Sequence, residues 1–337
     1  MTLLLLASAL VVGGLLAVQS SVNVRLNAAV GTPFGASTIQ LGVAATALFL
    51  VALATGTLDA ARLVADVPAW QLLAGIASPI YITTGILLFP RLGALVSVGL
   101  FVTGQVLVSL VLDVGGLIGV EQQPLTLGMV AGALAVLAGI TVVIRAQHRA
   151  RRVREQAIAA PTLRQANGAV ATRGPATHAV ARARTFIAIP WLAAGVVAGG
   201  VLPIQGAINA QVRRTVDASA TVGMISFIVA TASIALALAV LVALRRTPRP
   251  QVKPLRHMPW WGWLGGFAAA TYVVATFSLI PVIGAAPTVA LTVTGQQVAA
   301  ASFDHTGLFG LPIRRLSVTR MTGLVLLVAG SALVQLG

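Results

Sequence analysis

The stretch WQLLAGIASPIYITTGILLFPRLGA, residues 70–94, returns later in the chain as WGWLGGFAAATYVVATFSLIPVIGA, residues 261–285. The two copies share residues in one register: Trp70, Gly75, Tyr81, Pro90, Gly93 and Ala94 match Trp261, Gly266, Tyr272, Pro281, Gly284 and Ala285. The register continues downstream, where Thr103, Gly104, Gln105, Asp113, Gly116 and Gly119 match Thr294, Gly295, Gln296, Asp304, Gly307 and Gly310. Agreement over this length indicates that the chain consists of two homologous halves.

The repeat also extends upstream, to a pair of amides in each half. AVQSSVN, residues 17–23, corresponds to PIQGAIN, residues 203–209. Each copy places a glutamine four residues before an asparagine, as Gln19 with Asn23 and as Gln205 with Asn209. Residues four apart lie on the same face of a helix, so each half presents two amides side by side.

Composition determines the class of protein. Of the 337 residues, 58% are hydrophobic and 9% are charged, and the mean hydropathy is +0.96. Soluble domains carry roughly a quarter charged residues. The chain is therefore predicted to be an all-α integral membrane protein whose partner is the lipid bilayer. It has no cysteine, which excludes disulfides and cysteine-ligated metals.

Segment length predicts ten membrane spans. A helix rises about 1.5 Å per residue, so about 20 apolar residues cross a ~30 Å hydrocarbon core. The predicted spans are 3–22, 36–55, 71–89, 93–112, 125–144, 187–208, 219–243, 261–280, 284–303 and 321–336. No basic residue precedes the first apolar run, which favours a retained helix over a signal peptide. Because each half has five spans, the halves have opposite orientations, as in many secondary transporters.

Charge predicts how the chain is oriented. The two halves, residues 1–145 and 186–337, flank an Arg-rich linker, residues 146–185. Of the 22 Lys and Arg residues, 19 fall on the linker side of the predicted topology and three on the other side. The positive-inside rule then predicts a multi-pass protein of the cytoplasmic membrane with a cytoplasmic linker and extracytoplasmic termini. The linker has no aromatic residue among its arginines, which favours a solvated or membrane-surface segment over one that binds nucleic acid.

The repeated motifs resemble a known group of membrane proteins. Two five-span halves, the P-x-x-GA turn and the Q-x3-N pattern are similar to the drug/metabolite transporter (DMT) superfamily, which includes EamA-like proteins. PIQGAIN, WWGWLGG, TGQ and DHTGLFGLP resemble its YdcZ-type branch, here as a fused tandem. The resemblance implies a DMT-like bundle of ten helices and a transport role, without a particular substrate. Small multidrug-resistance relatives use a glutamate in the first span, which this chain lacks.

Polar side chains within the spans are the candidates for a substrate site. They are Gln19, Asn23, Gln205, Asn209, Gln105, Gln296, Tyr81 and Tyr272. In lipid such side chains face the interior of the bundle, where they either line a cavity or join helices by hydrogen bonds. The repeat does not decide between these alternatives, since both kinds of contact would be duplicated.

Titratable groups at the ends of the fourth and ninth spans are weaker candidates, for coupling to protons. Asp113 and Asp304 end the TGQ helices, and His305 follows Asp304. The alternative is that these residues mark the membrane interface or cap the next turn. The absence of a carboxylate within the spans favours a neutral, zwitterionic or anionic substrate over a bare cation.

Motifs for other functions are missing from the sequence. No nucleotide-binding loop, metal-ligand cluster or catalytic triad context is present, so we expect no enzyme activity, cofactor or metal. The leading hypothesis is a secondary transporter of a small molecule. The alternative is a non-transporting membrane scaffold or partner subunit, and the sequence leaves open whether the chain forms a homodimer.

Overall fold

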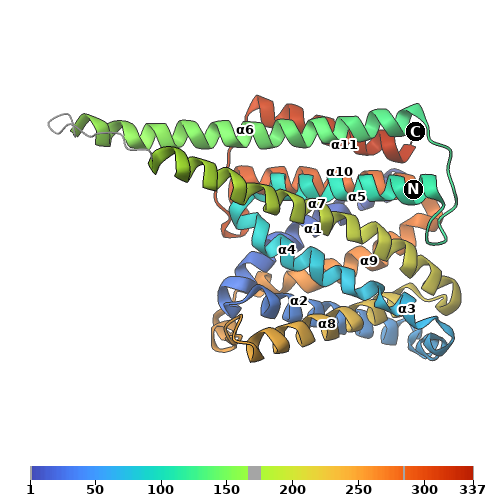
Figure 1. Cartoon of the computed structure of the whole chain (residues 1–337). Coiled ribbons are helices and arrows are strands. Elements are labelled where there is room, and N and C mark those ends of the chain that lie inside the picture. The colour runs from blue at the N-terminus through green and yellow to red at the C-terminus, as the bar shows by residue number, and fades with distance from the viewer. Residues whose placement is uncertain (1, 166–175, 284, 337) are drawn as a thin grey trace.

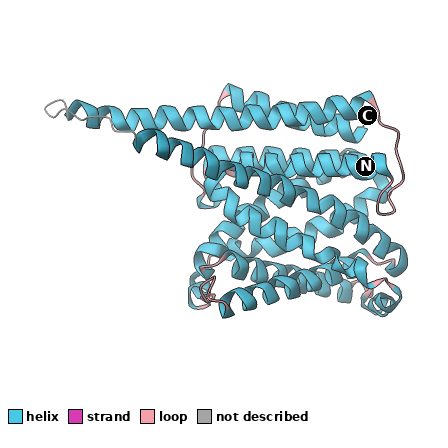
Figure 2. Cartoon of the chain, viewed as in Figure 1, coloured by secondary structure: helices cyan, strands magenta, loops and turns pink. Residues whose placement is uncertain are grey.

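The computed structural model describes residues 2–165, 176–283 and 285–336, without the side chains at 2, 151, 153–165, 176–188, 277, 280, 281, 285 and 286. The described residues form helices and loops and no strand (Figure 2). The α-helices are α1 (Thr2–Val30), α2 (Pro33–Ala54), α3 (Ala69–Leu72), α4 (Ala77–Leu92), α5 (Ala94–Gly115), α6 (Leu127–Gln165), α7 (Ala176–Val216), α8 (Ser219–Ala243), α9 (Leu264–Ile283), α10 (Ala285–Thr306) and α11 (Val318–Leu336). Short 3₁₀ turns lie between them: η1 (Leu58–Asp66), η2 (Leu73–Ile76), η3 (Lys253–His257), η4 (Trp260–Trp263) and η5 (Leu308–Gly310).

Eight segments of the described chain are long and apolar enough to cross a membrane. They comprise α1, α2, α3 together with α4, α5, the first part of α6, the second part of α7, α8 and α11. This finding confirms the predicted all-α membrane fold. The count of ten spans stays a prediction, because α9 and α10 are not among the eight. These two helices have 20 and 22 residues and lie within the same bundle (Figure 1).

Both ends of the predicted linker are helical in the structure. α6 continues to Gln165, well past the predicted end of the fifth span, and α7 begins at Ala176. The two helices extend beyond the bundle at the end opposite to both termini (Figure 1). The centre of the linker, residues 166–175, lies outside the described residues.

Helices of one half pack mainly against helices of the other half. The second spans α2 and α8 pack together, and so do the fifth spans α6 and α11. The first span α1 packs on α10 and α9, whereas the first span of the second half, α7, packs on α5 and α4. Every one of these contacts has an equivalent in the other half, which is the pairing that a two-fold axis between the halves would produce.

Glycines allow the first span of one half to touch the fourth span of the other. At Gly13 in α1, an added Cβ would lie 1.9 Å from the carbonyl oxygen of Thr292 in α10. At Gly295 in α10, it would lie 1.8 Å from the carbonyl oxygen of Leu10. The two backbones are therefore in direct contact, as small residues permit in membrane helices.

The same crossing is repeated between α7 and α5. A Cβ at Gly199 would lie 2.0 Å from the carbonyl oxygen of Phe101, and one at Gly104 would lie 1.9 Å from that of Val196. Gly199 stands at the repeat position of Gly13, and Gly104 at that of the glycine in α10. The two crossings are thus built from equivalent residues.

Glycines also join the fifth spans. An added Cβ at Gly132 in α6 would lie 2.6 Å from the carbonyl oxygen of Gly330 in α11, and one at Gly139 would lie 2.8 Å from that of Gly323. These two contacts are also equivalent in the repeat. α6 and α11 therefore form a close pair along one side of the bundle (Figure 1).

Candidate functional site

The amide pair of α7 is hydrogen-bonded to two neighbouring helices. The Nε2 atom of Gln205 donates to the Oγ atoms of Ser78 in α4, at 2.8 Å, and Ser226 in α8, at 3.2 Å. Ser78 Oγ also lies 3.1 Å from Gln205 Oε1, and Asn209 Nδ2 donates to Ser226 Oγ at 3.2 Å. We call Ser78, Gln205, Asn209 and Ser226 the saturated cluster. It joins α7 to both helices.

The equivalent amide pair of α1 has different surroundings. Gln19 and Asn23 are 3% and 1% exposed, and their carbonyl oxygens have no hydrogen-bond partner in the described part of the chain. Asn23 Oδ1 lies beside the backbone of Gly265 in α9, where an added Cβ would approach it to 2.5 Å. Gln40 of α2, 1% exposed, donates from Nε2 to the Gly265 carbonyl at 3.3 Å, and its Oε1 is also without a partner. We call Gln19, Asn23 and Gln40 the open cluster.

Substitutions within the repeat explain why the two clusters differ. Ala269 occupies the position of Ser78, and Gln40 occupies the position of Ser226. The α1 amides therefore lack the two hydroxyls that satisfy the α7 amides. Sequence reasoning missed Gln40, although a glutamine inside the second predicted span was a signal that could have identified it.

Tyr81 forms the centre of a further polar contact between the halves. Its hydroxyl, on a side chain 3% exposed, accepts a hydrogen bond of 2.8 Å from Gln296 Nε2 in α10. Ser20 of α1 lies beside the same hydroxyl, and the ring packs against that of Phe101 with centroids 4.6 Å apart. The structure thus brings together two of the candidates, Tyr81 and Gln296, next to the α1 amide face.

The repeat partners of Tyr81 and Gln296 are not joined in the same way. Tyr272, which is partly buried, lies beside Thr276 and Thr292 and near Tyr81. Gln105 is partly buried, and its Nε2 atom has no hydrogen-bond partner among the described residues. The polar contacts of Tyr81 and Gln296 therefore differ from those of their repeat partners, Tyr272 and Gln105.

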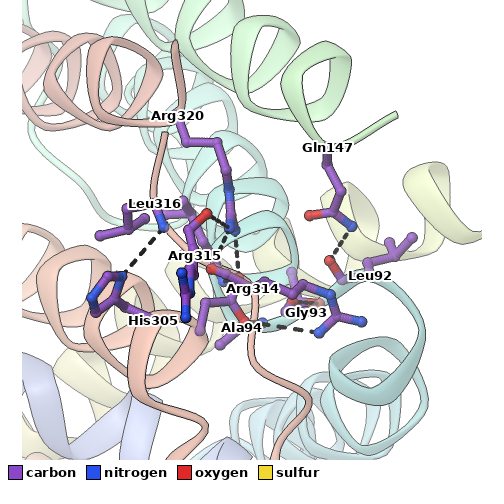
Figure 3. Close-up of polar contacts among 12 residues, drawn as sticks. Leu92, Gly93, Ala94, Gln147, His305, Arg314, Arg315, Leu316 and Arg320 are labelled. Carbon is purple, nitrogen blue, oxygen red and sulfur yellow. Dashed lines mark hydrogen bonds and ion pairs between the residues drawn. The ribbon is translucent and has the colours of Figure 1, made fainter. Parts of the chain in front are cut away.

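Asp304 belongs to a separate polar network, whose other members Ala94, Arg314 and Arg320 are labelled in Figure 3. Its carboxylate is 0% exposed and accepts hydrogen bonds from the backbone N–H groups of Ala94, at 2.7 Å, and Leu95, at 3.3 Å, at the start of α5. Arg320 of α11 pairs with it at 2.5 Å, and Arg314 lies 3.9 Å away. Asp304 thus caps one helix and pairs with another.

The α4–α5 turn brings the backbone up to this carboxylate. Gly93, with a φ of 87°, separates the two helices, and a Cβ there would meet Asp304 and Arg314 at 3.0 and 2.8 Å. Burial lowers the pKa of Arg314, and the Asp304 carboxylate opposes that change. His305 is exposed, and its Nδ1 accepts a hydrogen bond of 3.3 Å from the backbone N–H of Leu316.

Asp113 does not have the same surroundings as Asp304. It is partly buried near the end of α5, and its backbone carbonyl accepts a hydrogen bond of 2.8 Å from Gln123. Gln123 and Met129 stand where the second half has Arg314 and Arg320. The geometry gives Asp304 a structural task, and a coupling role for Asp113, Asp304 or His305 remains a hypothesis.

Comparison with known protein families explains the repeat. Residues 4–142 and 190–333 match one family, described as "Putative inner membrane exporter, YdcZ". The chain belongs to the YdcZ family. The two matched segments fall one in each predicted half, which confirms the resemblance to a tandem protein of the DMT type. YdcZ-family membership and the apolar helices together identify a multi-pass membrane protein of a transporter family rather than an enzyme family.

A solved structure shares the fold of this YdcZ-family chain. A crystal structure titled only as that of a protein aligns with a TM-score of 0.55 at 17% identity, covering 98% of each chain. The likeness extends over the whole molecule and concerns the fold alone. No curated protein matches the chain.

Proposed function

We propose that this YdcZ-family chain exports a small molecule by alternating access, with two inverted halves moving against each other around the buried polar side chains described above. Membership of an exporter family is the observation that carries the proposal. The packing supports it, because each first span crosses the fourth span of the other half at paired glycines. Alternating access in inverted-repeat transporters is largely a rigid-body rocking of one repeat against the other, and these crossings lie between the two halves.

The substrate site is proposed to lie where the halves meet. Tyr81 of α4 and Gln296 of α10 come from different halves and share a hydrogen bond away from lipid. Gln19, Asn23, Gln205, Asn209, Gln105 and Tyr272 complete the candidate set. Substrates of inverted-repeat transporters bind at the interface between repeats, and the bond between Tyr81 and Gln296 crosses that interface.

The proposed orientation places the linker in the cytoplasm. Of the basic residues, 19 of 22 lie on the linker side. An excess of this size outweighs the few charges on the other side. With ten spans, both termini are then extracytoplasmic.

Flux through purified protein in liposomes tests the proposal. Labelled metabolites and drugs are loaded inside, and their release is followed for the wild type and for Gln296→Leu, which removes the bond to Tyr81. We expect release with the wild type and a loss of about tenfold in the variant, from a hydrogen bond worth about 1.5 kcal/mol. Thr322→Val, on the exposed face of α11, is the control. A wild type that moves no compound would favour a scaffold or partner subunit.

A further inference from the structure

The open and saturated clusters lie towards opposite ends of the bundle. Asn23 precedes the end of α1 at Val30, and Gln40 follows the start of α2 at Pro33, so the open cluster lies towards the linker end. The two amides of the saturated cluster lie in the second half of α7, which runs away from the linker. Equivalent residues of the two halves thus occupy opposite depths of the membrane.

The glutamine of the saturated cluster has partners for both its amide oxygen and its amide nitrogen, whereas the oxygens of the open cluster have none among the described residues. The amide of Gln205 uses both of its polar atoms within the protein, in contacts with Ser78 and Ser226. In the open cluster, three carbonyl oxygens, those of Gln19, Asn23 and Gln40, are buried without a partner among the described residues. A buried acceptor without a hydrogen bond costs free energy, and a bound water, ion or ligand that donates to it offsets that cost.

We propose that the open cluster is the site where substrate is loaded, that it binds a neutral small molecule presenting N–H or O–H donors, and that the saturated cluster is the closed seal towards the other side. This inference rests on the proposed transport function. It adds Gln40 to the candidate residues, and it assigns different tasks to two amide pairs that the sequence makes equivalent.

The unpaired atoms determine the class of ligand. The Gly265 carbonyl can only accept a hydrogen bond, so Gln40 must turn its nitrogen towards it and leave its oxygen free. Three free acceptors call for a ligand with several donors. The open cluster contains no carboxylate, and the buried Asp304 is paired with Arg320. A cation would therefore lose its hydration without gaining a counter-charge, which favours a neutral ligand.

Matched substitutions at equivalent positions test the difference between the clusters. Gln205→Met removes the partner of two serine hydroxyls and is expected to lower the melting temperature of the purified protein. Gln19→Met removes an unpaired buried acceptor at nearly constant volume and is expected to leave the melting temperature unchanged or to raise it. Should Gln205→Met fail to accumulate, Ser226→Ala provides the same comparison. Equal destabilisation by the substitutions in the two clusters would overturn the assignment.

Binding of defined probes tests the ligand class. Purified wild type is titrated at millimolar concentrations with neutral donors (erythritol and N-methylurea), with ethylammonium and with lactate, and its melting temperature is followed. We expect saturable stabilisation by a neutral donor, lost in Gln19→Met. Stabilisation only by ethylammonium or lactate, or by none of the four, would overturn the assigned class.

Flux separates this inference from the proposed function. In liposomes, Gln19→Met is expected to lose export by about tenfold while keeping its stability. A wild type that exports together with a Gln19→Met variant that exports equally well would overturn the loading site and leave the transport function standing. Stabilisation by a neutral donor without any flux would instead overturn the transport function.

Discussion

Asp304 shows how a charge is kept inside this protein. The carboxylate has no contact with solvent, yet two backbone N–H groups and the guanidinium of Arg320 surround it. Arg320 is itself 4% exposed and also donates to the carbonyl oxygen of Arg314 at 2.7 Å. The network therefore ties the α4–α5 turn of the first half to α10 and α11 of the second half.

Breaking this pair is predicted to be costly. Arg320→Met would leave the Asp304 carboxylate buried without its counter-charge, which destabilises a protein by about 3–5 kcal/mol. Thermal or denaturant unfolding of the purified protein would measure the loss. Arg315→Met, on an exposed neighbour, is the control and should have little effect. An equal stability of the two variants would contradict the importance of the pair.

At the scale of residues, the sequence identified which polar side chains lie in the spans but not which residues they contact. It singled out the duplicated amides and tyrosines because polar residues are rare within these spans. It could not show that Gln205 is satisfied whereas Gln19 is not, because this depends on Ser78 and Ser226 from two other helices. Arg320 was not a candidate either, since its pairing with Asp304 becomes visible only when α11 is packed beside α10.

At the scale of elements, the crossings of first and fourth spans depend on glycine. Gly13→Ala would place a methyl group 1.9 Å from the carbonyl oxygen of Thr292, so α1 and α10 would have to separate. Overpacking of this kind costs about 1–3 kcal/mol. The expected result is a lower melting temperature and weaker export.

Gly206→Ala is the matched control for this prediction. Gly206 is also in a first span, but it is exposed and a Cβ there would have no atom within 4 Å. Because alanine favours helix over glycine by up to about 1 kcal/mol, this variant should be as stable as the wild type or more so. Loss of stability in Gly206→Ala but not in Gly13→Ala would contradict the role of the crossings.

The elements themselves could largely be predicted from the sequence. Apolar length located the spans, and the repeat showed that the two halves correspond. Which helices pack together could not be predicted in the same way. Helices in lipid are apolar on nearly all faces, so they lack the amphipathic pattern that marks the buried face of a helix in a soluble protein. The helical continuation of α6 into the linker was not predicted, since the arginines there were interpreted as marking a solvated or membrane-surface segment.

At the scale of the whole molecule, the orientation can be tested by labelling. The chain has no cysteine, so one introduced thiol is unique. Asp59→Cys and Arg249→Cys place it in exposed loops separated by an odd number of spans. In intact cells a membrane-impermeant maleimide should label the first variant, and it should label the second only after lysis. The wild type serves as the unlabelled control.

Two other labelling patterns would contradict parts of the proposed topology. Labelling of Arg249→Cys alone in intact cells would reverse the orientation and place the linker outside. Labelling of both variants from the same side would mean that the number of spans between α2 and η3 is even. With an even number of spans, the count of basic residues on each side would change, and the orientation inferred from that count would no longer follow.

The two halves of the molecule make different polar contacts, and this difference affects the equilibrium between the inward-open and outward-open states of the proposed transporter. In a perfectly symmetric transporter, exchanging the roles of the halves converts the inward-open state into the outward-open state at equal free energy. Under the proposed mechanism, each contact without an equivalent would shift that equilibrium: the Asp304–Arg320 pair would favour closure of the linker end, and the serine–amide contacts around Gln205 would favour closure of the other end. Resting molecules should therefore populate an occluded state, and a ligand can open one end only by the difference in its affinity for the two states.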